Sequence, residues 1–186
     1  GGERREMTVM FIDLKGFTSI SEKLSPDDLV RLINGFFGHM TEAVTHHGAV
    51  VDKFMGDAVM AYWGPPFTGP DEHARLACAA AAEAFERFDT FRDEVVRDFE
   101  RLQNPHEIDL RIGVSTGEMI VGTIGSKATS SFTVMGDPVN LGARLEGANK
   151  AYGTRALISE RTRELAGQEV LVREVDYIRV KGKNRP

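Results

Sequence analysis

The sequence predicts an α+β fold in which helices pack on one face of a ferredoxin-like sheet. The first observation behind this prediction is the element order, β-α-β-β-α-β-β-α-β, in which short strands alternate with amphipathic helices. The second is an almost wholly apolar strand near the N-terminus. The third is the composition of the chain: its 186 residues are 41% hydrophobic and 27% charged, as expected for one globular domain with a single core.

Two elements at the start of the chain are well marked. Residues 7–13 (MTVMFID) predict a strand that is buried on both faces and ends in the carboxylate of Asp13. Ser25, followed by Pro26 and two acids, is typical of a helix N-terminus. An apolar stripe at helical spacing follows, formed by Leu29, Leu32, Ile33, Phe36, Phe37, Met40 and Val44.

A hairpin and a long helix come next. Residues 49–54 and 58–63 are strand-like and flank Met55-Gly56-Asp57, so a second carboxylate, Asp57, is predicted on a hairpin turn. After a loop rich in proline and glycine, Asp71 is expected to open an Ala-rich helix that runs to about Leu102.

The C-terminal half predicts further strands and two helices. The strand-like segments are 110–116, 119–124, 132–135, 156–159, 170–174 and 177–180, with a turn at Gly117-Glu118 between the first two. Asp137 is expected to cap a helix whose first residue is Pro138. A short helix through Leu165 precedes the last two strands.

Composition and charge exclude several classes of function. A formal net charge of −5 gives no basic surface for nucleic acid, although a few placed groups can still hold a small anion. We expect no signal peptide, and the sequence contains no apolar run near the ~18 residues of a membrane span. Cys78 is the one cysteine, which excludes an internal disulfide and favours a cytoplasmic location. The leading Gly1-Gly2 is typical of an expression scar, so we expect a domain excised from a longer protein.

The two carboxylates at element ends are candidate metal ligands. Asp13 and Asp57 terminate a strand and a hairpin turn that are neighbours in such a sheet, and Mg²⁺ is usually held by one or two carboxylates plus substrate phosphates. After Asp13, a glycine turn leading into Phe17 and Thr18 is suited to presenting backbone N–H groups to a triphosphate. Taken alone, an acid after a strand is more often a turn or cap residue.

Five segments together give a more specific pattern: FIDLKGFTSISE (11–22), KFMGDAVMAYWG (53–64), RIGVSTGEMIVGTIGS (111–126), TVMGDPVNLGARLEG (133–147) and VKGK (180–183). In this order, and over nearly the whole chain, they resemble the successive motifs of class III adenylyl and guanylyl cyclase catalytic domains. The resemblance implies a single catalytic domain over 1–186, a palm-type sheet, and a head-to-tail homodimer. It also implies an upstream sensor or membrane domain in the full-length protein.

The resemblance implies roles for individual residues. Asp13, the backbone carbonyl of Ile12, and Asp57 match the positions that hold two divalent cations, Mg²⁺ or Mn²⁺. Lys53 matches the lysine that reads the adenine ring, and Thr133 stands where many cyclases have aspartate. Guanine-selective relatives resemble this chain with Glu and Cys or Gly at these two positions, so ATP is the expected substrate. Threonine at 133 is similar to a largely bacterial subgroup whose members often respond to bicarbonate.

The remaining matched residues face the ribose and the phosphates. Asn140 matches the asparagine that orients the ribose, Arg144 matches the arginine that stabilises the transition state, and Lys181 matches a lysine on the terminal phosphates. Asn140 and Arg144 are four apart on the predicted helix and so project from one face. The implied reaction converts ATP into 3′,5′-cyclic AMP and pyrophosphate, with either Asp13 or a water molecule taking the proton.

Other interpretations remain open beside this one. The chain can be a guanylyl cyclase, or a catalytically silent domain that binds nucleotide or only dimerises. A diguanylate cyclase is disfavoured because MGDA stands at residues 55–58 in place of G-G-[DE]-[DE]-F. His39, His46 and His47 lack partners with metal-ligand spacing, and residues 122–127 lack phosphate-loop spacing and are interpreted as part of a hairpin turn.

Overall fold

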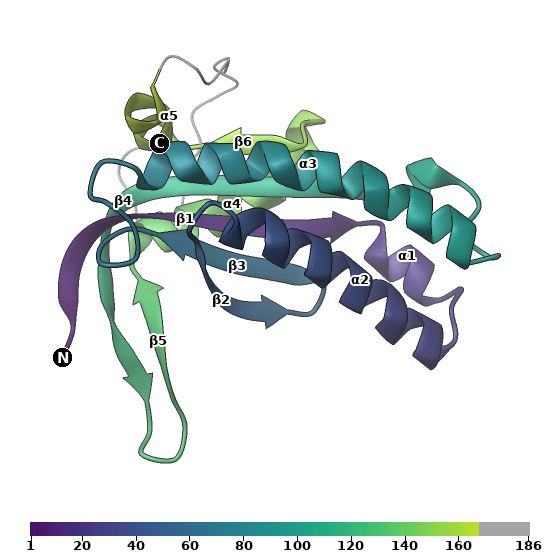
Figure 1. The fold of residues 1–186 in the computed structure, drawn as a ribbon, viewed down its shortest axis with the longest axis horizontal. Coiled ribbons are helices and arrows are strands. Elements are labelled where there is room, and N and C mark those ends of the chain that lie inside the picture. The colour runs from purple at the N-terminus through teal and green to yellow at the C-terminus, as the bar shows by residue number, and fades with distance from the viewer. Residues whose placement is uncertain (168–186) are drawn as a thin grey trace.

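The computed structural model describes residues 1–167, which form one sheet flanked by helices (Figure 1). The strand order is β2-β3-β1-β4-β5, each neighbouring pair is antiparallel, and β6 lies parallel to β4. The strands are β1 (Glu3–Lys15), β2 (Val50–Met55), β3 (Ala58–Trp63), β4 (Asp109–Gly125), β5 (Ser130–Met135) and β6 (Ala156–Ile158). The α+β class and the sheet predicted from the element order are confirmed.

The helices begin and end close to the predicted signals. They are α1 (Phe17–Ser21), α2 (Pro26–Thr45), α3 (His73–Asp98), α4 (Asp137–Tyr152) and α5 (Glu160–Ala166), with a short 3₁₀ turn at Pro105–Glu107. Ser25 caps α2 as predicted, because its side chain accepts a hydrogen bond from the Asp28 N–H. At α4 the capping residue is Gly136 rather than Asp137, which is the first helical residue.

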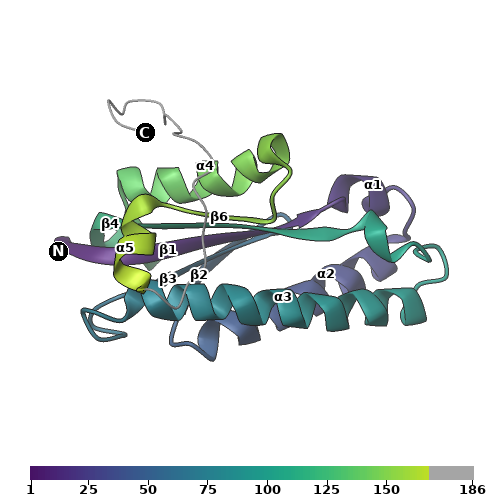
Figure 2. The ribbon, with the colours of Figure 1, turned by 90° about the horizontal axis from the view of Figure 1, so that it is seen from above.

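The helices are divided between the two faces of the sheet (Figure 2). Met10 and Ile12 of β1 join the core that α2 and α3 complete with Phe36 and Phe88. Val9 and Phe11 point the other way, into a second cluster with residues of β3, β4 and β5.

The prediction that the helices gather on one face is therefore wrong for α4. A Cβ added at Gly142 of α4 would lie 3.0 Å from Val9 and 3.1 Å from Phe11, so this helix packs on the second face. The physical reason is that β1 is apolar on both faces and needs cover on each side. The predicted burial of this strand on both faces is confirmed.

Residues 110–124 form a single strand rather than two. The turn expected at Gly117-Glu118 is absent, and β4 runs unbroken from Asp109 to Gly125. A Cβ at Gly117 would lie only 2.6 Å from the Pro138 ring, so this glycine allows α4 to approach the strand closely. Reversal comes later, at Ser126–Thr129, before β5.

A buried chain of polar side chains ties the second half of the domain to β1. The Thr8 hydroxyl lies 2.8 Å from both His73 Nδ1 of α3 and the Thr116 hydroxyl of β4. The Thr116 hydroxyl in turn lies 2.8 Å from that of Thr162 in α5.

None of the helices within residues 1–167 has the length and apolarity that crossing a membrane requires.

Candidate active site

The two predicted metal ligands lie side by side. Asp13, near the end of β1, pairs in register with Ala58, the residue directly after Asp57 in the β2–β3 turn. Gly56 makes that turn with a φ of +61°, a conformation that glycine adopts readily. The side chains of Asp13 and Asp57 share a hydrogen bond, so the structure brings the predicted pair together.

The electrostatics of this pair suit a divalent cation. Burial, the hydrogen bond to Asp57, and the charges of Glu146 and Asp57 raise the pKa of Asp13 to about 7. A bound Mg²⁺ or Mn²⁺ would neutralise the negative charge of two neighbouring carboxylates that repel one another in this way. The carbonyl of Ile12, the residue before Asp13, lies close by in the chain. No group of three or more acidic, His or Cys side chains within residues 1–167 is arranged to hold a metal.

Glu146 of α4 is a third carboxylate beside this pair. Burial and the charge of Asp57 raise the pKa of Glu146, while the Arg111 charge lowers it. Glu146 comes this close because β4 has a glycine, Gly113, where α4 packs on it. A Cβ at Gly113 would lie 2.3 Å from the Glu146 backbone nitrogen, so only glycine permits this contact between helix and strand. No signal in the sequence predicts Glu146 beside Asp13 and Asp57, since its position depends on how α4 packs on the sheet.

The glycine turn after β1 has the expected form. Gly16 has a φ of +89°, and a Cβ there would lie 2.3 Å from the Glu107 carbonyl oxygen, so no other residue fits. Phe17 and Thr18 are the first residues of α1, where backbone N–H groups have no acceptor earlier in the helix. The ring of Phe17 packs against the core.

Lys53 and Thr133 meet at a residue that the sequence did not single out. The Thr133 hydroxyl donates to Asp52 Oδ2 at 3.0 Å, and the Lys53 ammonium lies 3.6 Å from the same oxygen. Lys53 is on β2 and Thr133 on β5, at opposite ends of the strand order, so the sheet curls to bring them together. The pairing of β2 with β3 shifts register between Val51 and Lys53, which identifies Asp52 as the extra residue of a β-bulge.

Asn140 and Arg144 lie on the exposed side of α4. Gly142, Leu145 and Asn149 form the buried side of the helix. Within residues 1–167, no hydrogen bond or ion pair joins Asn140 or Arg144 to Asp13 or Asp57. Lys181 and the strands predicted over 170–174 and 177–180 lie outside the described residues.

Comparison with known proteins places these features in a family. Residues 2–186 match the family described as the adenylate and guanylate cyclase catalytic domain. The chain belongs to this family. Adenylate cyclase 1 of Rhizobium meliloti (strain 1021) is 35% identical over 181 residues, covering 97% of this chain and 26% of that protein. The adenylate cyclase of Anabaena cylindrica is 34% identical over 97% of this chain and 35% of its own length. The chain thus spans about a quarter to a third of these cyclases.

Solved cyclase domains share the fold closely. The adenylyl cyclase CyaB from P. aeruginosa superposes with a TM-score of 0.88 at 31% identity, covering all of this chain and 92% of that one. The guanylyl cyclase Cya2 superposes with a TM-score of 0.85 at 36% identity, covering 98% and 89%. An adenylyl cyclase and a guanylyl cyclase are both similar to this chain to this degree, so overall identity does not indicate whether the chain prefers ATP or GTP. That preference depends on individual residues.

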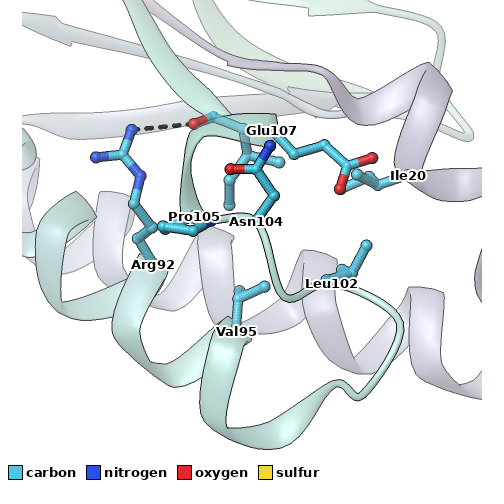
Figure 3. Close-up of a pocket in the computed structure, with 8 residues that line it drawn as sticks. Ile20, Arg92, Val95, Leu102, Asn104, Pro105 and Glu107 are labelled. Atoms are coloured by element: carbon cyan, nitrogen blue, oxygen red, sulfur yellow. Dashed lines mark hydrogen bonds between the residues drawn. The ribbon is translucent and has the colours of Figure 1, made fainter.

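Other polar features lie apart from the cyclase residues. His46 and His47 lie 3.1 Å and 3.2 Å from the two oxygens of Glu83 on α3. A small cavity beneath α1 is lined mainly by apolar side chains, and at its rim Arg92 donates to the Ile108 carbonyl (Figure 3). None of the candidate site residues lines this cavity.

Proposed function

We propose that this domain is an adenylyl cyclase, which converts ATP into 3′,5′-cyclic AMP and pyrophosphate. The observation that carries the proposal is the meeting of Lys53 and Thr133 at one carboxylate, although they come from opposite ends of the strand order. A lysine and a hydroxyl at this place suit the N1 and N6 edge of adenine. The adenylate cyclases of R. meliloti and A. cylindrica support the same reaction.

Asp13, Asp57 and the Ile12 carbonyl are the groups proposed to hold two divalent cations, Mg²⁺ or Mn²⁺. Bound there, such cations lower the pKa of the ribose 3′-hydroxyl and neutralise charge on the leaving pyrophosphate. The raised pKa of Asp13 supports this assignment, because the pair carries more negative charge than it can balance by itself. Glu146 adds to that negative field.

The reaction is an intramolecular displacement at the α-phosphate. The ribose 3′-oxygen forms a bond to the α-phosphorus, and the bond from that phosphorus to the bridging oxygen of pyrophosphate breaks. The proton of the 3′-hydroxyl passes to Asp13 or to water. Arg144 supplies a permanently charged planar donor for the charge that builds on the α-phosphate, and Asn140 orients the ribose. The amides of Phe17 and Thr18, and the side chain of Lys181, hold the remaining phosphates.

Two copies of the domain are proposed to form the active unit, head to tail. Large apolar side chains are exposed along β2 and the β4–β5 arm, which extends away from the helices in Figure 1. They are Phe54, Met55, Ile120, Ile124, Phe132 and Met135. Exposed apolar side chains gathered on neighbouring strands are typical of an interface. A RhoGC guanylyl cyclase domain, 26% identical with a TM-score of 0.68, is described as a non-canonical dimer, and another is described as monomeric, so assembly differs among relatives.

Regulation is proposed to come from the rest of a longer protein. The matched cyclases are about three to four times the length of this chain, which leaves room for sensor or membrane parts. Because ATP is the proposed substrate, the domain is placed on the cytoplasmic side.

The direct test is to incubate the purified domain with ATP or GTP and with Mg²⁺ or Mn²⁺, and to measure both cyclic nucleotides. Cyclic AMP that depends on the metal and exceeds cyclic GMP is the expected result. Preferred formation of cyclic GMP would make the protein a guanylyl cyclase. Binding of ATP without product, from a domain shown to dimerise, would identify a silent nucleotide-binding domain instead.

A further inference from the structure

We propose that Asp52 is a positioning residue for base selection, which holds Lys53 in place and fixes the direction of the hydrogen bond that Thr133 offers to the nucleotide. This inference rests on the proposed function, because it assigns the adenine preference to a residue outside the pair that reads the base.

The geometry of Asp52 is that of a built-in hydrogen-bond acceptor. Its side chain is only 2% exposed, and the β-bulge in β2 takes it out of the regular strand ladder. A buried carboxylate is costly unless it is paired, and here Lys53 and Thr133 supply the pairing. The same contacts that satisfy Asp52 therefore hold the two base-reading side chains in place.

The Thr133 hydroxyl is left with acceptor capacity only. A threonine hydroxyl has one hydrogen to donate and two lone pairs. An ionised carboxylate only accepts, so the hydrogen of Thr133 is committed to Asp52, 3.0 Å away. The remaining lone pairs can accept from the exocyclic amine of adenine. The exocyclic oxygen of guanine would instead face them acceptor to acceptor.

Lys53 has donor capacity only, because an ammonium carries no lone pair. Its ammonium lies 3.6 Å from Asp52 Oδ2, and its remaining hydrogens can donate to the unprotonated N1 of adenine. In guanine N1 carries a hydrogen and would meet another donor. Both free capacities thus match adenine, and both mismatch guanine. Asp52 brings this about at Thr133 by taking the hydroxyl hydrogen, and at Lys53 by holding in place an ammonium that can only donate.

Tyr62 is a neighbour of Asp52 on the adjacent strand. Burial and the negative charge of Asp52 raise the pKa of Tyr62 on β3 to about 12, so the phenol stays neutral. Tyr62 also contacts β5, since its ring centroid lies 6.4 Å from that of Phe132, the residue before Thr133. This aromatic contact joins β3 to β5 one residue away from Thr133.

The test compares Asp52→Asn with wild type, and measures kcat/KM for ATP and for GTP. The asparagine amide can donate to Thr133, which frees the hydroxyl hydrogen for guanine. The ATP/GTP ratio of kcat/KM is therefore expected to fall by about ten- to a hundred-fold. Asp89→Asn is the matched control, because Asp89 lies on α3 with a side chain that is 72% exposed, and its ratio should equal that of wild type.

Thr133→Val separates positioning from a general loss of structure. It removes the acceptor for the adenine amine, so the ratio should fall, and adding Asp52→Asn should then change the ratio little further. Equal losses for ATP and GTP in Asp52→Asn, or independent effects of the two changes on the ratio, would overturn the proposal. An unchanged ratio in Thr133→Val would also overturn it, even if Asp52→Asn does not fold. Failure of the proposed function is recognised separately, by a wild-type domain that makes no cyclic AMP.

Discussion

At the scale of single residues, the candidate site concentrates negative charge that the fold alone does not need. Asp13, Asp57 and Glu146 come from β1, a hairpin turn and α4, and their mutual repulsion appears in the raised pKa of Asp13. Such an arrangement costs stability and is typical of a site built for a cation. Function and stability should therefore respond in opposite directions when one of these charges is removed.

Asp57→Asn is expected to abolish metal-dependent turnover without harming the fold. The loss of a ligand should lower activity by about a hundred-fold or more, since metal ions contribute several kcal/mol of charge stabilisation. The melting temperature without metal should equal or exceed that of wild type, because the repulsion at Asp13 is relieved. Calorimetry and a cyclic AMP assay on the same preparation check both parts. Turnover near wild type with the same metal dependence would contradict the two-metal assignment.

At the scale of elements, the contact between α4 and β4 decides whether the site forms. Gly113 and Gly117 are strand glycines at which a Cβ would meet α4 at 2.3 Å and 2.6 Å. The helix carries Glu146 on its sheet side and Asn140 and Arg144 on its exposed side. A small change in this contact therefore moves several candidate residues together.

Gly113→Ala should destabilise the domain strongly, by about 2–3 kcal/mol or more, because the new methyl group meets backbone atoms that cannot move aside. Gly147→Ala is the matched control on α4. A Cβ there would meet nothing within 4 Å, and alanine should stabilise the helix by about 0.5–1 kcal/mol. Urea unfolding of both variants gives the comparison, and similar effects at the two positions would refute the close-packing argument.

The buried hydroxyl chain gives a pH dependence that belongs to α3 and β1. Burial lowers the pKa of His73, and its Nδ1 lies 2.8 Å from the Thr8 hydroxyl. The folded state therefore binds fewer protons at His73 than the unfolded state does. Its contribution to stability is present above the unfolded pKa of about 6.5 and is lost as the pH falls below that value.

Wild type and His73→Asn should accordingly differ most in unfolding free energy at pH 7.5. The difference should shrink below pH 6.5, by at most about 1.4 kcal/mol for each pH unit. Urea titrations at pH 7.5 and 5.5 measure it. A constant difference across this range would mean that His73 is not held neutral.

The sequence was informative where a local rule decides the structure. The run at 7–13, the cap at Ser25 and the Gly56 turn follow from local chemistry, and they place Asp13 and Asp57 together. Contacts between distant elements were harder to predict. Gly117 resembled a turn signal, but it serves a contact with Pro138. Asp52 was missed because a bulge depends on the pairing of two strands, and Glu146 because its position depends on the packing of α4.

At the scale of the whole molecule, the orientation of α4 separates the candidate residues of one chain. Glu146 faces Asp13, and Arg144 stands two positions earlier, which is about 200° around a helix. Arg144 therefore points away from the carboxylates of its own chain. Two-fold symmetry with a second copy can bring Arg144 of one chain to Asp13 and Asp57 of the other, and it creates two equivalent sites.

Mixing two inactive variants tests this shared site. Asp57→Ala and Arg144→Ala should each be inactive alone, because each lesion is present in both sites of its homodimer. In a mixed dimer both lesions fall in one site, and the other site is intact. With random pairing, half of the dimers are mixed and each has one working site of two, so activity should return to about a quarter of that of wild type. Subunit exchange is confirmed independently by mass spectrometry of tagged chains. If exchange occurs and no activity returns, Asp57 and Arg144 act in the same chain, and α4 must turn from the orientation described here to bring them together.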